Sequence, residues 1–186
     1  MTEAKFKLAA SSAALLITGI CTAIVFAAPI ETTSMKITGA FSSVFIISAA
    51  AWKFPQKFYC MAMVFDIFAA ALGSVINLYK TLGFYDRFVH FLSGILLADA
   101  GMIIVSYLFR KCDLKSNMLI KIPFAFFFSS ACAGFWEIYE FTADTFINAN
   151  MQGGNTNTMG DIVSGVLGAA AYSIISVIVY KKKSAP

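Results

Sequence analysis

The segment FWEIYEFTAD, residues 135–144, guides the interpretation of the whole chain, because it places carboxylates at the end of a long apolar run. Glu137, Glu140 and Asp144 are spaced by three and four residues, so a helix would carry all three on one face. Charged groups in an apolar span are costly in lipid and normally face a protein interior or a water-filled cavity. The segment therefore predicts a polar site inside a membrane protein.

The composition also indicates a membrane protein. Of the 186 residues, 59% are hydrophobic and 13% are charged, and the mean hydropathy is +0.77, whereas soluble domains contain about 25% charged residues. The basic residues behind the net charge of +4 are scattered between apolar runs, so they do not form the single patch that binds nucleic acid. We therefore expect membrane lipids, and no nucleic acid, around this chain.

Six apolar runs are long enough to be interpreted as membrane spans. We predict an all-α polytopic protein, a single domain over residues 1–186 built as a bundle of six transmembrane helices. Lys80–Gly83 is predicted to be a turn and Asn148–Thr158 a polar loop. The predicted spans are residues 8–28, 37–52, 58–79, 84–109, 118–146 and 159–180.

The distribution of basic residues predicts the orientation of the spans. With a cytoplasmic N-terminus, the inner segments would hold eleven Lys and Arg residues, and the outer segments would hold three, Lys36, Lys80 and Arg87. This asymmetry follows the positive-inside rule. Both termini are predicted to be cytoplasmic, in a multi-pass protein of the plasma (inner) membrane.

This orientation brings several polar residues to one level. His90, Glu140 and Asp161 would all lie within roughly 10 Å of the outer helix ends, at 1.5 Å per residue. Asp86 precedes His90 by four residues and would share its helix face. We predict one site at the extracytoplasmic ends of the last three spans, with the following candidate catalytic residues: His90, Asp86, Glu137, Glu140 and Asp161.

Four carboxylates around one imidazole favour either a metal ion or shared protons. Oxygen ligands with one nitrogen suit a divalent ion such as Mg, Mn, Fe or Zn, although His90 is the only histidine and a three-histidine zinc site is excluded within one chain. The candidate metal ligands are His90, Glu137, Glu140 and Asp161, with Asp86 as the group that orients His90. The flanking polar residues Tyr85, Arg87, Asp144 and Asn157 are candidates for substrate binding.

Three motifs carry a resemblance to a known family. They are Tyr85-Asp86-Arg87-x-x-His90-Phe91, Glu137-x-x-Glu140-Phe141, and the segment from Gln152 to Asp161 with the small residues that follow. Together they resemble the YjdF-like bacterial inner-membrane family, a resemblance that implies a location and no activity. More distantly, their order is similar to VanZ-like proteins, which are linked to glycopeptide (teicoplanin) resistance. Where the family usually has an aspartate, four residues before Asp161, this chain has Asn157.

Three functions remain open on the sequence. The first is an enzyme that acts on a lipid or lipid-linked substrate at the outer leaflet, with a divalent metal ion as its cofactor. The second is a small-molecule or proton-coupled transporter, in which Asp66 and Asp99 continue a polar path from the same site. The third is a non-catalytic membrane adaptor, in which the cluster only joins helices. A homo-oligomer is compatible with all three.

Overall fold

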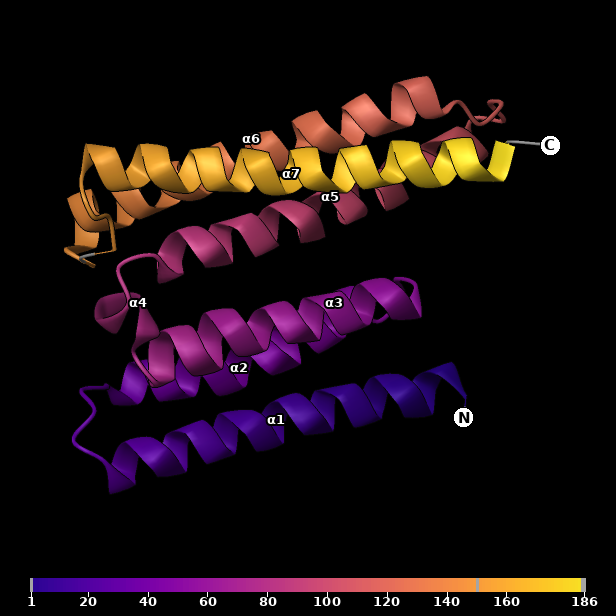
Figure 1. Cartoon of the computed structure of the whole chain (residues 1–186). Coiled ribbons are helices and arrows are strands. Elements are labelled where there is room, and N and C mark those ends of the chain that lie inside the picture. Colours follow the sequence, from indigo (N-terminus) through magenta and orange to yellow (C-terminus); the bar gives the residue numbers. More distant parts are fainter. Residues whose placement is uncertain (1, 150, 185–186) are drawn as a thin grey trace. The chain divides into compact units, whose positions relative to one another are not determined.

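The computed structural model describes residues 2–149 and 151–184, and within these ranges it contains helices and no strands. Six of its helices are long and apolar enough to cross a membrane, so the prediction of an all-α protein with six membrane-spanning helices is confirmed. The orientation of the termini stays a prediction. The elements (Figure 1) are α1 (Glu3–Ala27), α2 (Ser34–Ala51), α3 (Gln56–Asp66), the π-helix η1 (Ile67–Val75), α4 (Leu78–Thr81), α5 (Tyr85–Lys111), α6 (Met118–Ile147) and α7 (Asn155–Ser184).

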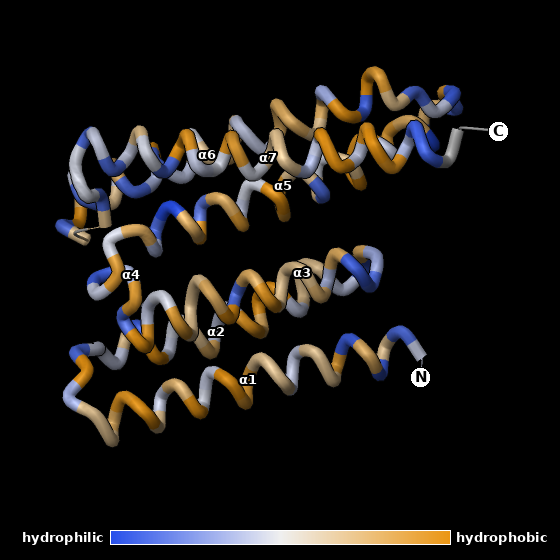
Figure 2. The backbone as a smooth tube through the Cα atoms, in the orientation of Figure 1, coloured by the Kyte–Doolittle hydropathy of each residue, from blue (hydrophilic) through white to orange (hydrophobic). Residues whose placement is uncertain are grey.

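Polar residues define where several of these helices begin and end. The side chains of Thr2, Thr33 and Asn117 accept hydrogen bonds from the first turns of α1, α2 and α6, which satisfies backbone N–H groups that have no partner inside the helix. Helix α6 ends at Asn148, whose φ of 52° is left-handed. In Figure 2 the long helices are mostly hydrophobic, and blue segments lie at the start of α1, at the end of α7 and at connections between helices.

The predicted third span, residues 58–79, is wrong at its end. The chain is helical from Gln56 to Val75, and its last part is the π-helix η1. Asn77 then adopts a left-handed backbone with φ 69°, which stops the helix before the short α4 begins at Leu78. The predicted turn at Lys80–Gly83 therefore overlaps α4, because the left-handed Asn77, three residues before Lys80, has already ended the span.

The chain packs as two compact units, one up to Val89 and one from His90 onward, so the boundary lies inside α5. The single domain over residues 1–186 stays a prediction. In the first unit α1, α2, α3 and η1 pack against one another. One lysine of this unit, Lys7, is only 4% exposed, and its Nζ donates to the carbonyls of Trp52 and Phe54 and pairs with Glu3. Lys7 thereby connects α1 to the segment that follows α2.

In the second unit, small residues bring three helices into close contact. A Cβ added at Gly94 on α5 would collide with the backbone carbonyl of Gly165 on α7, and one at Gly168 would collide with the carbonyl of Phe91. On the side of α6, the Ser129 hydroxyl donates to the Gly94 carbonyl at 2.8 Å. Small residues permit such close approach of membrane helices. The three helices that carry the candidate site are held together by these contacts.

Candidate metal centre

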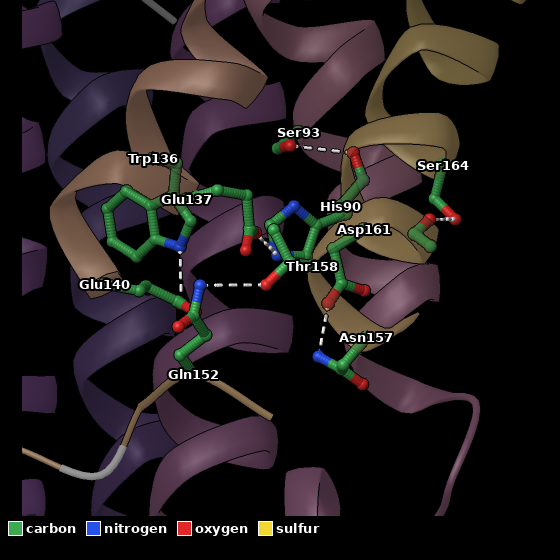
Figure 3. Close-up of polar contacts among 11 residues, drawn as sticks. His90, Ser93, Trp136, Glu137, Glu140, Gln152, Asn157, Thr158, Asp161 and Ser164 are labelled. Carbon is green, nitrogen blue, oxygen red and sulfur yellow. Dashed lines mark hydrogen bonds and ion pairs between the residues drawn. The ribbon is translucent and has the colours of Figure 1, made fainter. Parts of the chain in front are cut away.

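His90, Glu137 and Glu140 come together in the second unit (Figure 3). One ligand atom from each side chain lies within 4.8 Å of the other two, and all three residues are buried. His90 comes from the first turns of α5, while the two glutamates come from one face of α6, where a spacing of three places them on adjacent turns. The structure thus gathers one imidazole nitrogen and two carboxylate oxygens from two helices.

The distance between His90 and Glu137 fits a shared ion. His90 Nε2 and Glu137 Oε1 are 3.6 Å apart, with side chains that are 8% and 4% exposed. Two ligands that bind a tetrahedral ion at about 2.1 Å lie about 3.4 Å from each other. The pair therefore needs little movement to accept a metal, and the same distance also suits an ion pair if the imidazole is protonated.

Glu140 has a partner that the sequence analysis did not assign to the site. The indole Nε1 of Trp136 donates a hydrogen bond to Glu140 Oε1 at 2.8 Å (Figure 3). The two residues are four apart on α6, so the bond runs along one helix face. Such a bond fixes one oxygen of the carboxylate while leaving its negative charge in place.

Asp161, on α7, is 1% exposed and receives a hydrogen bond from the amide Nδ2 of Asn157. Asn157 belongs to the first turns of α7, because this helix begins at Asn155 and includes residues predicted to be a loop. At the next residue of α7, the Thr158 hydroxyl accepts a hydrogen bond from the Gln152 side-chain amide at 3.0 Å. These contacts order the start of α7 beside the cluster (Figure 3).

Three of the residues predicted to bind substrate have other positions. Asp86 lies four residues before His90 on α5, whereas Arg87 is exposed. The Tyr85 hydroxyl donates to the Phe68 carbonyl within the first unit. Asp144 accepts the backbone N–H groups of Met151 and Gln152 at 2.7 and 2.8 Å. Asp144 thus holds the connection to α7, which is a structural task and a different one from the substrate binding that was expected.

The charge balance of the second unit makes the cluster unusual. From His90 onward, every Lys and Arg lies at residue 110 or beyond, near the end of α5, the start of α6 or the end of α7. His90, Glu140 and Asp161 lie near the opposite ends of the same helices. No Lys or Arg of this unit therefore lies at the same end of these helices as Glu137, Glu140 and Asp161, and a metal ion or bound protons would help to compensate the charge of these buried acids.

Helix lengths place the cluster close to the membrane boundary. Helices α5 and α6 have 27 and 30 residues, or about 40 and 45 Å, against a hydrocarbon thickness of about 30 Å. His90 lies about 7.5 Å from the start of α5 and Glu140 about 10.5 Å from the end of α6. If each helix is centred in the bilayer, both side chains begin about 3 Å inside the hydrocarbon.

Two features of the site could not be found from helical spacing alone. An indole within an apolar run is typical of an interface or core aromatic and gives no sign that its N–H has a polar partner, as that of Trp136 does. Asp99 accepts a hydrogen bond from the Tyr172 hydroxyl at 2.7 Å, and these residues lie on different helices, 73 positions apart in the chain. The one feature of the sequence that pointed to these two hydrogen bonds is that an acid within an apolar span needs a hydrogen-bond donor.

Comparisons with known proteins agree with this architecture. A family model described as predicted membrane protein (DUF2238) matches residues 6–182. A protein from Thermotoga maritima, described as uncharacterized, is 30% identical over 121 residues, which cover 62% of this chain and 57% of that protein. The chain thus aligns with somewhat more than half the length of this relative. No solved structure matches.

Proposed function

Since the chain belongs to the DUF2238 family of predicted membrane proteins, we propose that it is a membrane enzyme with one divalent metal ion that acts on a lipid or lipid-linked substrate. The observation that carries this proposal is the cluster of His90, Glu137 and Glu140, whose ligand atoms lie within 4.8 Å of one another in a buried position. The plasma membrane is the proposed location. A kinship with VanZ-like proteins, suggested by the order of the motifs, belongs to the same proposal.

The donor set supports a catalytic rather than a purely structural ion. One nitrogen and two oxygens are three protein ligands, and catalytic sites combine three ligands with an open position. An ion held there would supply Lewis acidity that polarises a carbonyl or phosphoryl oxygen of the substrate. Asp161, buried beside the cluster and held by Asn157, is the proposed acid that exchanges a proton with the substrate, or a fourth ligand to an ion of higher coordination number that still keeps a position open. Asp86, one turn before His90, is the proposed group that orients the imidazole.

The position of the cluster along the helices supports a lipid-borne substrate. A site that begins about 3 Å inside the hydrocarbon lies at the level where a polar headgroup meets its acyl chains. The headgroup of a lipid can reach this level while its tails stay in the bilayer. A water-soluble substrate would have to leave water to reach it, which costs free energy for each polar group that loses its hydrogen bonds.

The proposal is tested by turnover of lipids in proteoliposomes. The purified protein is reconstituted into a total bacterial lipid extract, and the lipids are compared by mass spectrometry before and after incubation. We expect a lipid species to be consumed by the wild type, the reaction to stop with a chelator and with Glu137→Gln, and the control Asp99→Asn to remain active. Asp99 is a matched control because it is also a buried acid of the second unit. A wild type that changes no lipid contradicts the enzyme.

A proton-coupled carrier is the second candidate, and the pair Asp99 and Tyr172 favours it. Asp99 is buried and hydrogen-bonded to Tyr172, and it follows His90 on α5 by nine residues, or about 13.5 Å further along the helix. Ionisable groups at successive depths of a span are typical of proton paths. The lipid experiment gives a different answer for this candidate, because a carrier would leave every lipid unchanged.

The carrier is tested with a pH-sensitive dye sealed inside the same proteoliposomes. If the protein carries protons, an imposed ion gradient should change the internal pH in the wild type, and Asp99→Asn should abolish this change. Proton movement that is unaffected by Asp99→Asn would contradict the role of this pair. If neither lipid turnover nor proton movement is seen, the enzyme and the carrier are both contradicted and the non-catalytic adaptor is favoured.

A further inference from the structure

We propose that Trp136 is a positioning residue for Glu140 and that its indole N–H sets the affinity of the cluster for a divalent ion. The proposal rests on the proposed metal function and adds to it a residue whose side chain binds no metal and no substrate. Trp136 acts through the carboxylate that it touches. The evidence is the geometry of these two side chains on α6.

The hydrogen bond has one direction only. An indole can donate through Nε1 and has no acceptor, so Trp136 Nε1 is the donor and Glu140 Oε1 the acceptor, at 2.8 Å. The ring itself is held by Tyr139, with the two ring centroids 5.4 Å apart and the planes tilted by 45°. A carboxylate with one oxygen fixed in this way has lost most of its rotational freedom before any ligand arrives.

Burial distinguishes this tryptophan from an ordinary interface aromatic. Trp136 is 49% exposed, whereas Glu140 is 8% exposed. A tryptophan in an interfacial belt presents its apolar ring to lipid and its N–H to water or headgroups. Here the N–H serves a buried carboxylate within the protein. The ring forms an outer wall, and the polar atom contributes to the cluster.

An indole suits a partner of a metal ligand because it donates a hydrogen bond without adding charge. A lysine or arginine at this position would neutralise Glu140 and compete with a metal, whereas a neutral indole leaves the site's charge unchanged. Loss of a hydrogen-bond partner of a metal ligand typically weakens metal binding by about 10–100-fold.

The test measures Co²⁺ affinity by calorimetry in detergent, starting from metal-free protein. Trp136→Phe keeps an aromatic ring beside Tyr139 and removes the donor. A second variant carries 3-benzothienylalanine at position 136, which keeps the shape of the indole and replaces its N–H by sulfur. We expect both to raise the Kd for Co²⁺ by about 10–100-fold, measured at a temperature where each variant is fully folded, and to lower the melting temperature of the metal-free protein because a buried carboxylate loses its donor. The control Tyr139→Phe keeps its ring and should leave the Kd unchanged.

Tryptophan fluorescence gives an independent signal. The chain has two tryptophans, so Trp52→Phe leaves Trp136 as the only one, and Co²⁺ bound to Glu140 should quench it. An unchanged Kd in both position-136 variants overturns the positioning role and leaves the metal site intact. If Tyr139→Phe weakens Co²⁺ binding as much as the two position-136 variants do, the effect comes from packing of the aromatic pair and the inference is wrong. If the wild type binds no Co²⁺, the proposed metal function itself fails.

Discussion

Replacement of Gly94 by alanine should separate the helices that carry the site. The added Cβ would overlap the carbonyl oxygen of Gly165 and approach the backbone of Ala169. Both are backbone atoms of α7, so no side-chain rotation can relieve the contact. Helix α7 must shift away from α5, and with it Asp161, which lies one turn before Gly165.

The size of the effect follows from two opposing contributions. Insertion of an extra methyl group into a well-packed contact costs about 1–3 kcal/mol, while alanine in place of glycine within a helix returns about 0.5–1 kcal/mol. We expect a net loss of about 1–2 kcal/mol. For a chain of this size the melting temperature should then fall by about 2–8 °C.

The matched control is Gly134→Ala on α6, where an added Cβ would meet no atom within 4 Å. This variant should gain about 0.5–1 kcal/mol from helix propensity alone. Thermal unfolding of both variants in the same detergent, followed by circular dichroism, compares them directly. If Gly94→Ala is as stable as Gly134→Ala, the close contact of α5 and α7 is not as described and the reasoning is refuted.

Three further predictions concern other parts of the chain. Lys7→Met keeps the apolar stem but leaves two backbone carbonyls after α2 without their donor, so the unfolding free energy should fall by about 1–3 kcal/mol; a wild-type melting temperature would contradict this. Asn157→Asp replaces a donor to Asp161 by a second carboxylate. The melting temperature of the metal-free protein should therefore fall, and the increase in melting temperature on addition of Mn²⁺ should become larger. An unchanged response to Mn²⁺ would contradict this prediction. In a cysteine-free background, a cysteine at position 155 should react with an impermeant thiol reagent in intact cells and one at position 183 should not; the reverse pattern would invert the predicted orientation.

The spans were predictable because the length and composition of an apolar run directly determine whether a helix can cross a bilayer. Their ends were less so. Helix α7 begins at Asn155, before its apolar run, because polar residues such as Asn157 continue the helix while they serve the site. Helix η1 ends at Val75, inside an apolar run, because the backbone of Asn77 turns left-handed.

Helical periodicity was enough to predict which residues share a helix face and a depth in the membrane. The spacing of Glu137 and Glu140 places them on one face, and depth counted along the helices brought His90 to the same level. The pairing of Asp99 with Tyr172 depends on how α5 and α7 pack, which no local pattern encodes. The hydrogen bond from Trp136 to Glu140 is local. An indole can either face lipid with its apolar ring or donate a hydrogen bond through its N–H, and the apolar residues around Trp136 are typical of the first role.

The metal content of the purified protein tests the central claim most directly. Wild type, Glu140→Gln and the control Asp99→Asn are purified without chelator, and their metals are measured by plasma mass spectrometry and related to protein concentration. The account predicts one divalent ion per chain in wild type and Asp99→Asn and none in Glu140→Gln. It also predicts that a chelator lowers the melting temperature only where the ion is bound, because a ligand specific for the folded state stabilises it. A metal-free wild type whose Glu140→Gln variant is equally stable would contradict the account, since protons would then compensate the buried acids.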